Sequence, residues 1–359
     1  MKSLTRRGFI GLGASAAMVA ALAGCSSGGG SSASASASAS ASASASAASA
    51  SAASASAKAA TGSGSALRFV TGGQQGTYYG FGQLLATHAT NNAGVNIETL
   101  SSDGSKANVE SIEDGLAELG FCQSDVMAYA YEGKNIFDGI KFEKFSTVAA
   151  LYDEQVQIVT CNPDIKTVAD LKGKRVSIGA PNSGVYFNAI DILGAYDITE
   201  KDITPTYQSF GDSADALKNE QIDAAFIVAG APTTAITDLS TSKTAYLVAL
   251  DDEHVTKLLG LSPYYVKASI PANTYPGQTE AVTTVAVSAV ILAAKTVSDD
   301  DVYAFVKDIF DSAKDSTTAS THAKYAELSV DKGGSITTVP YHPGAAKFFE
   351  EEGIKVTTA

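Results

Sequence analysis

Cysteine, histidine and tryptophan are scarce in this chain of 359 residues, which has three cysteines, four histidines and no tryptophan. The histidines lie far apart, without the short spacings that bring metal ligands together, so we expect no metal and no cofactor. Three cysteines are too few for a disulfide framework. An oxidising compartment would permit one bridge, and whether Cys122 and Cys161 are joined stays open.

Long apolar runs and basic residues are also in short supply. The one long apolar run, from residue 8 to 23, spans about 16 residues, fewer than the roughly 20 that a membrane-spanning helix needs. Four of the 25 Lys and Arg lie before residue 66, and all 38 Asp and Glu lie after it. The region from residue 66 onward is therefore strongly acidic. This charge argues against binding to nucleic acid and against direct contact with an anionic bilayer.

The first 65 residues have the pattern of an export signal and a tether. Arg6 and Arg7 lie in TRRGFIG, which is close to the twin-arginine pattern of signals exported by the Tat route. The apolar run ends in LAGC, which fits cleavage before Cys25 and lipidation of its thiol. We predict a Tat-type lipoprotein signal over 1–25; an ordinary secretory signal with an accidental cysteine is the alternative.

Residues 26–65 consist almost wholly of Ser, Ala and Gly. They offer no apolar face to bury, so we predict a disordered linker. The chain is then expected outside the cytoplasm, on the outer face of the cell membrane or in the periplasm. It would touch the membrane through its lipid anchor alone.

The rest of the chain is long enough for a large core and two lobes. Short β-rich runs alternate with helical runs, which indicates a parallel α/β architecture. Gly76 and Gly104, both in strand-to-helix turns, are followed 108 and 107 residues later by Gly184 and Gly211. This recurrence indicates two similar halves, although any two βαβαβ units resemble each other at this level.

A two-lobed chain of this kind must pass between its lobes twice. The runs at 151–159 and 283–294 are the predicted crossings. We therefore assign 66–155 and 286–359 to lobe I and 156–285 to lobe II. A hinge and a ligand cleft are expected between them.

Four glycine-containing turns enter predicted helices: TGGQQGTYY, SSDGSKAN, GAPNSGVY and SFGDSAD. Such turns offer free backbone N–H groups and the positive end of a helix dipole to an anionic group. None contains an arginine, so a bidentate clamp on a carboxylate is absent from them. Asp125 and Glu154 lie near strand ends, where they could receive a ligand ammonium; surface acids or helix caps are the plainer interpretation.

Nucleotide and catalytic motifs are missing. TGGQQG has neither the G-x-G-x-x-G order nor a closing Gly-Lys-Ser/Thr, so it is no dinucleotide fingerprint and no P-loop. Ser183 does not lie in a G-x-S-x-G elbow, and Cys122 has no evident base. We predict that the chain is not an enzyme.

From about residue 67 to 354 the chain resembles the TAXI-type solute receptors of TRAP (tripartite ATP-independent periplasmic) transporters. The resemblance is carried, in the family's order, by TGGQQGTYYGFG, SDGSKANVESI, QSD at 123–125, LYDEQVQIV, IKTVADLKGKRVSIGAPNSG, ALKNEQIDAAFIVAGAP and VPYHPGAAKFFEEEG. It implies an α/β, two-lobed type II periplasmic-binding-protein fold. Such a receptor closes on a small carboxylate or amino acid, such as glutamate or glutamine, and delivers it to the TRAP membrane subunit.

Carried over residue by residue, the resemblance implies ligand contacts from both lobes. They are Gly76, Thr77, Tyr78, Ser102, Gly104, Ser105, Asn108, Gln123, Asp125, Tyr152, Glu154, Ser183, Gly184, Val185, Ala229 and Pro232. Val185 stands where the family often has a hydroxyl residue, which would remove one polar contact. A ligand-sensing lipoprotein for a signalling partner would share these features, and a surface hydrolase is the remaining alternative.

Overall fold

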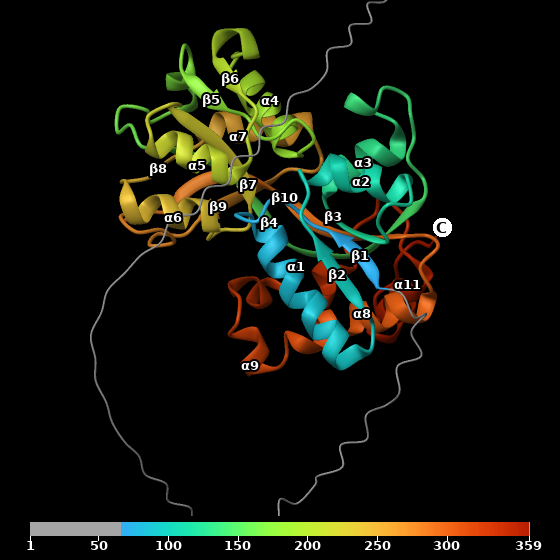
Figure 1. Ribbon diagram of the computed structural model, residues 1–359. Helices are drawn as coiled ribbons and strands as arrows, with labels where there is room; N and C mark the ends of the chain where they lie inside the picture. The colour runs from blue at the N-terminus through green and yellow to red at the C-terminus, as the bar shows by residue number, and fades with distance from the viewer. Residues whose placement is uncertain (1–65, 359) are drawn as a thin grey trace, which may run out of the picture. The chain divides into compact units, whose positions relative to one another are not determined.

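The computed structural model describes residues 66–358, so the predicted signal, the lipidation of Cys25 and the linker lie outside the described residues. The described residues form one ten-stranded mixed sheet with helices packed on it (Figure 1). The strand order is β2-β1-β3-β10-β4-β7-β5-β6, with β8 beside β4 and β9 beside β10. The strands are β1 (Leu67–Val70), β2 (Ile97–Leu100), β3 (Leu119–Gln123), β4 (Phe145–Thr160), β5 (Arg175–Ser177), β6 (Thr204–Thr206), β7 (Ala224–Ala229), β8 (Tyr246–Val248), β9 (Val266–Ile270) and β10 (Val282–Ala294).

Helices follow most of the strands along the chain. The α-helices are α1 (Thr77–His88), α2 (Ser105–Glu113), α3 (Ser124–Glu132), α4 (Val185–Ala195), α5 (Phe210–Lys218), α6 (Thr234–Ser242), α7 (Asp252–Leu261), α8 (Asp299–Ser312), α9 (Ser316–Ala319), α10 (Val330–Gly333) and α11 (Pro343–Glu351). A π-helical turn, η1 (Ala89–Ala93), extends α1. The 3₁₀ turns are η2 (Asn135–Phe137), η3 (Val168–Leu171), η4 (Glu200–Asp202) and η5 (Ala323–Glu327).

Two lobes share this sheet, and their strands follow the same order. In lobe I the parallel strands β2-β1-β3 are followed by antiparallel β10 and then by β4. In lobe II the parallel strands β6-β5-β7 are followed by antiparallel β4 and then by β8. The recurring order agrees with two similar halves, and the predicted two-lobed α/β architecture is confirmed.

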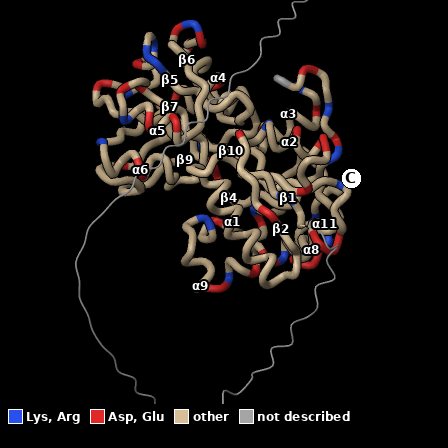
Figure 2. The backbone as a smooth tube through the Cα atoms, viewed as in Figure 1, with Lys and Arg blue, Asp and Glu red and all other residues tan. Residues whose placement is uncertain are grey.

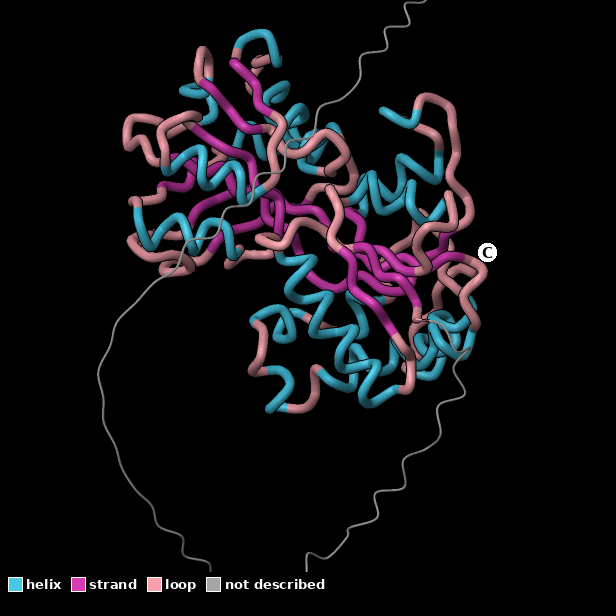
Figure 3. The backbone as a smooth tube through the Cα atoms, in the orientation of Figure 1, coloured by secondary structure: helices cyan, strands magenta, loops and turns pink. Residues whose placement is uncertain are grey.

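The long strands β4 and β10 belong to both lobes, as Figure 3 shows. They contain the two segments that were predicted to cross. The two strands pair with each other from Ala286–Gln155 to Ala294–Phe145, and their register shifts twice, once on each side of the Val290 and Ile291 pairs. Both strands therefore pass through the junction of the lobes, where a hinge would have to bend.

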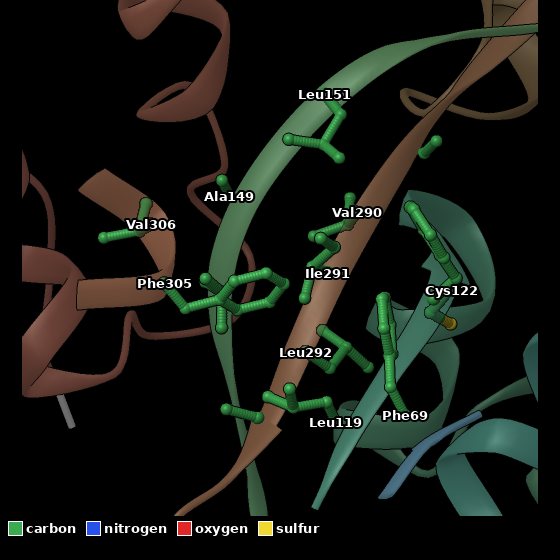
Figure 4. Packing of buried hydrophobic residues seen from close by; sticks show 14 of the residues in the cluster. Phe69, Leu119, Cys122, Ala149, Leu151, Val290, Ile291, Leu292, Phe305 and Val306 are labelled. Carbon is green, nitrogen blue, oxygen red and sulfur yellow. The ribbon is translucent and has the colours of Figure 1, made fainter. Parts of the chain in front are cut away.

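The core of lobe I is built from both ends of the described chain. Phe69 and Leu119 from its start pack in one cluster with Ile291 and Phe305 from its end (Figure 4). In α8 the apolar residues recur three and four positions apart, which gives the helix one face to bury on the sheet. Lobe II has two clusters of its own, one around Phe226 and one around Ile227, on opposite faces of β7.

Local sequence signals explain several helix starts. Thr167 and Asp170 form a capping box at η3, in which each side chain bonds the other residue's backbone N–H. Charged residues lie mainly on the outer segments, whereas β7 and β10 carry no acidic or basic residue (Figure 2).

The cysteines and histidines of the described residues form neither a disulfide nor a metal site. Cys122 is buried and Cys161 half-buried, and both are free thiols, which settles the question left open by the sequence. Among residues 66–358, no cluster of His, Cys, Asp or Glu could hold a metal ion. No helix among those residues is long and apolar enough to span a membrane.

Candidate functional site

A cavity of about 80 Å³ lies where the two lobes meet. The turns that follow β1, β2, β5 and β6 form much of its wall. Because these parallel strands end at the same edges of the sheet, their turns meet there, as is usual for ligand sites in α/β folds. The lining residues are Gly72, Gly73, Gly76, Thr77, Tyr78, Ser102, Asp103, Gly104, Ser105, Gln123, Glu154, Ala180, Ser183, Gly184, Val185, Gln208, Ser209, Phe210, Val228 and Ala229.

Four helices begin at this cavity. The first residues of α1, α2, α4 and α5 are Thr77, Ser105, Val185 and Phe210, and all of them line it. The first N–H groups of an α-helix have no partner inside the helix. Together with the helix dipoles they make the cavity wall a set of donors suited to an anionic group.

Two of the helix-capping glycines are required by geometry. Gly104 has φ of 111°, a conformation that side chains rarely allow. At Gly184 a Cβ atom would lie 1.6 Å from Oε1 of Gln123, which belongs to the opposite lobe. Glycine at position 184 therefore lets the two lobes approach each other.

The hydroxyl groups of the wall are not equally available to a ligand. Thr77 donates to the carbonyl oxygen of Gly230 at 2.8 Å, and Ser183 donates to that of Ala180 at 2.7 Å. Ser102 accepts from the Gly104 N–H and Ser105 from the Gln123 N–H, both at 3.1 Å. The protons of Ser102 and Ser105 are thus the ones left for a ligand.

A buried carboxyl group closes one end of the cavity. Glu154, on β4, is 2 % exposed and accepts a hydrogen bond from the Tyr78 hydroxyl at 2.9 Å. Burial raises the pKa of Glu154 to about 8, and hydrogen bonds from Tyr78 and Gln123 oppose that rise. Oε1 of Gln123 has no hydrogen-bond donor among the described residues, so it is an acceptor left for a ligand.

Twelve of the sixteen predicted ligand contacts line this cavity, and the structure brings them together from both lobes. Asn108, Asp125, Tyr152 and Pro232 lie outside the wall. Asn108 is buried under it, where its Nδ2 donates to the carbonyl oxygens of Thr71 and Phe121, both at 2.7 Å. Its amide is occupied in joining the ends of β1 and β3.

The other three are turned away from the cavity as well. Oδ2 of Asp125 accepts from Asn188 Nδ2 of lobe II at 2.9 Å, and burial raises the pKa of Asp125 to about 6. The Tyr152 side chain is fully buried, with Lys324 Nζ 5.4 Å from its ring centre. Pro232 follows β7, whose Val228 and Ala229 reach the cavity instead.

Contacts between the lobes surround the cavity. Besides the bond from Thr77 to Gly230, the Ala107 N–H donates to the Asn182 carbonyl at 3.1 Å. The Ala235 N–H of lobe II donates to the Gln75 carbonyl of lobe I at 3.2 Å. The lobes are therefore held together by backbone groups on more than one side of the cavity.

Eight lining residues were not predicted from the sequence. Most of them lie inside the four glycine-containing turns, so the motif signal was present although the residues were not singled out. They are Gly72, Gly73, Asp103, Ala180, Gln208, Ser209, Phe210 and Val228. Gln208 and Val228 lie outside the four quoted turns, and only the folded chain brings them to the wall.

Comparison with known proteins gives a family and a fold. The sequence profile of the NMT1-like family matches residues 69–353. The structure resembles PhnD1 from Prochlorococcus marinus (MIT 9301), solved with methylphosphonate, with a TM-score of 0.50 and 10% identity over 73% of this chain and 90% of that one. It also resembles the alkanesulfonate-binding protein SsuA from Xanthomonas axonopodis pv. citri, solved with MOPS (TM-score 0.43, 16% identity, 80% and 90% covered). The fold is that of periplasmic solute-binding proteins.

Proposed function

The chain belongs to the NMT1-like family, and we propose that it is an extracytoplasmic solute receptor of the TAXI type. It captures a small organic acid, such as glutamate, glutamine or a related carboxylate, between its lobes and delivers it to the membrane subunit of a TRAP transporter. The observation that carries the proposal is the convergence of four helix N-termini on one cavity between the lobes. Helix N-termini bind a carboxylate without a basic side chain.

The proposed ligand contacts are those of the sixteen residues that line the cavity. Asn108, Asp125, Tyr152 and Pro232 support the wall from behind. We also propose lobe bounds of 66–155 with 286–359, and 156–285. Most members of the core clusters agree with this division, because residues before Gln155 and from Ala289 onward pack together in lobe I. Phe187 of lobe II also joins that cluster, and Val287 packs in a lobe II cluster.

The proposal excludes catalysis at this site. The Ser183 hydroxyl donates to a backbone carbonyl, and no histidine is among the residues that line the cavity. Cys122 is buried, and burial raises the pKa of its thiol well above the ordinary value, so it would be a poor nucleophile.

A thermal-shift panel tests the proposed function. Glutamate, glutamine, pyroglutamate and 2-oxoglutarate are added separately to the purified protein. A ligand at 100 times its dissociation constant stabilises the folded state by about 2.7 kcal/mol, so at least one of the four should raise the Tm by several degrees. If none of these compounds raises the Tm, the proposal is wrong.

A pair of variants on α4 tests whether binding uses the cavity. Gly184→Ala places a Cβ against Gln123 and should weaken binding of the stabilising compound at least tenfold. Gly194→Ala, on the same helix, has nothing within 4 Å of the added atom and should leave the affinity unchanged. Equal affinities in the two variants would place the ligand elsewhere.

A further inference from the structure

The cavity and its entrance contain acidic side chains and no basic one among the described residues that line them. Glu154 and Asp103 line the cavity. Asp103, Ala180, Gln208 and Ser209 also line an outer hollow of about 460 Å³, to which Asp212 and Asp215 contribute. The charged side chains that line this hollow are all negative, and they repel an anion that enters through it.

Donors and acceptors lie next to each other inside the cavity, because Tyr78 in the first turn of α1 bonds Glu154 and Ser105 at the start of α2 accepts from the Gln123 N–H. The helix N-termini and the Ser105 hydroxyl supply donors, whereas Glu154 and Oε1 of Gln123 supply acceptors. Gln123 is 2 % exposed, and a buried acceptor without a donor is costly unless a ligand or water supplies one. A ligand that satisfies this cavity must therefore offer one anionic group and, close to it, N–H donors.

Building on the proposed receptor function, we propose that the cavity discriminates by charge. It accepts a solute with one anionic group and one cationic N–H group, of net charge zero, and rejects solutes with a second anionic group. The helix N-termini hold the single anionic group, and the cationic group lies between Glu154 and Gln123. A second carboxylate would find no cationic side chain among the residues that line the cavity, and the Asp103 carboxylate at its entrance would repel it.

The charged and titratable groups around Glu154 favour the same assignment. Five groups interact with Glu154 so that they shift its pKa or have their own pKa shifted by it. They are Tyr78 of α1, Cys122 of β3, Asp125 of α3, Tyr152 of β4 and Lys324 of η5. The one cation among these groups, Lys324, is already paired with Glu327. Because the pKa of Glu154 is raised to about 8, the group is mostly protonated at pH 7. A ligand cation beside it favours the carboxylate, so binding should release a proton.

Isothermal titration calorimetry of the full chain at pH 7 tests the proposal. Glutamine represents the zwitterion of net charge zero, and glutamate and 2-oxoglutarate represent ligands with two carboxylates. Each is titrated in phosphate and in Tris, because the difference in heat between the buffers gives the number of protons released. We expect glutamine to bind at least tenfold more tightly than either dicarboxylate and to release roughly one proton.

Two variants and a control test whether Glu154 and Asp103 cause the discrimination by charge. Glu154→Gln should weaken glutamine binding at least tenfold and abolish the proton release. Asp103→Asn, at the exposed entrance, should narrow the preference for glutamine over 2-oxoglutarate without threatening the fold. Glu253→Gln, exposed on α7, should change neither quantity.

The outcomes separate the proposed discrimination by charge from the receptor function. Equal or tighter binding of the dicarboxylates, or glutamine binding without proton release, would contradict the discrimination by charge but not the receptor function. If no compound binds, the receptor function itself is wrong. Tighter binding of glutamine with proton release that persists in Glu154→Gln would remove Glu154 from the proposal.

Discussion

Glu154 is an acidic residue whose environment disfavours its charged form. Its carboxyl group is 2 % exposed on the strand β4, with the Tyr78 hydroxyl at 2.9 Å. Burial without a direct cationic partner disfavours the charged form, and this is why the pKa of Glu154 rises to about 8. A protein that holds such a group loses stability when the group ionises, so its retention points to a use in binding.

Stability should therefore fall as the pH rises through the Glu154 titration. The folded protein holds the proton of Glu154 up to about pH 8, whereas the unfolded chain releases it near the ordinary pKa of 4.5. Between those values the folded state binds more protons, so the free energy of unfolding decreases by about 1.4 kcal/mol per pH unit. Urea denaturation without ligand, from pH 6.5 to 7.5, measures this slope.

Glu154→Gln is the matched comparison, since it removes the titration and keeps the shape of the side chain. The variant should lack the part of the slope that Glu154 supplies. Burial lowers the pKa values of His322 and His342 below 6.5, so at these two groups the unfolded chain binds more protons near pH 6.5 and stability rises with pH. This opposing contribution is the same in both proteins and cancels in the comparison. The same slope in both proteins would mean that Glu154 is already ionised in the folded state.

At the scale of elements, the site depends on where four helices begin. Ser209 caps α5 beside the cavity: its hydroxyl accepts from the Asp212 N–H at 3.2 Å and donates to the Asp212 carboxylate at 2.7 Å. Ser298 makes the same two bonds with Asp301 at the start of α8, at 3.1 and 2.7 Å. Of these two serines, only Ser209 lines the cavity.

This pair separates the stability of a helix cap from its part in binding. Ser209→Ala and Ser298→Ala should each lower the free energy of unfolding by about 1 kcal/mol, because each helix loses its cap. Ser209→Ala should also weaken ligand binding several-fold, because the first turn of α5 forms part of the cavity wall. Ser298→Ala should bind as the wild type does, and denaturation and calorimetry on both variants measure the two effects. A similar loss of affinity in both would show that binding follows overall stability.

Most elements could be predicted because their signals are local. The alternation of β-rich and helical runs predicts β1 to β3 and α1 to α3, and Thr167 with Asp170 predicts the cap of η3. The short strand β8 and the edge strand β9 were missed. Three residues such as Tyr246–Val248 become a strand only by pairing with β4, which no local pattern shows.

Like the helices and strands, the candidate site could be predicted only where its sequence signals are local. Glycine-containing turns predict which helix N-termini face a ligand, because their geometry is set within a few residues. The direction of a polar side chain behind those turns depends on distant partners. Asn108 turns to Thr71 and Phe121, and Asp125 turns to Asn188, 63 residues further along the chain. A local sequence pattern does not show which distant residues pair in this way.

At the scale of the whole molecule, the negative charge of the lobes disfavours direct binding to an anionic membrane. The described helices include none that could span a membrane, and the region from residue 66 onward carries 38 acids. We propose that the leader supplies the attachment: Arg6 and Arg7 direct export, and a lipid on Cys25 holds the receptor near its transporter.

Anchoring should therefore be separable from ligand binding. Cys25→Ser should move the protein from the membrane fraction to the soluble extracytoplasmic fraction of cells, with the thermal shift by ligand unchanged. Replacing both Arg6 and Arg7 by lysine should instead leave unprocessed protein inside the cell, because the Tat pattern requires the arginine pair. Fractionation followed by immunodetection measures both changes. A membrane-bound Cys25→Ser protein would show that something other than the lipid anchors the chain, and the acidic lobes would then need a protein partner for attachment.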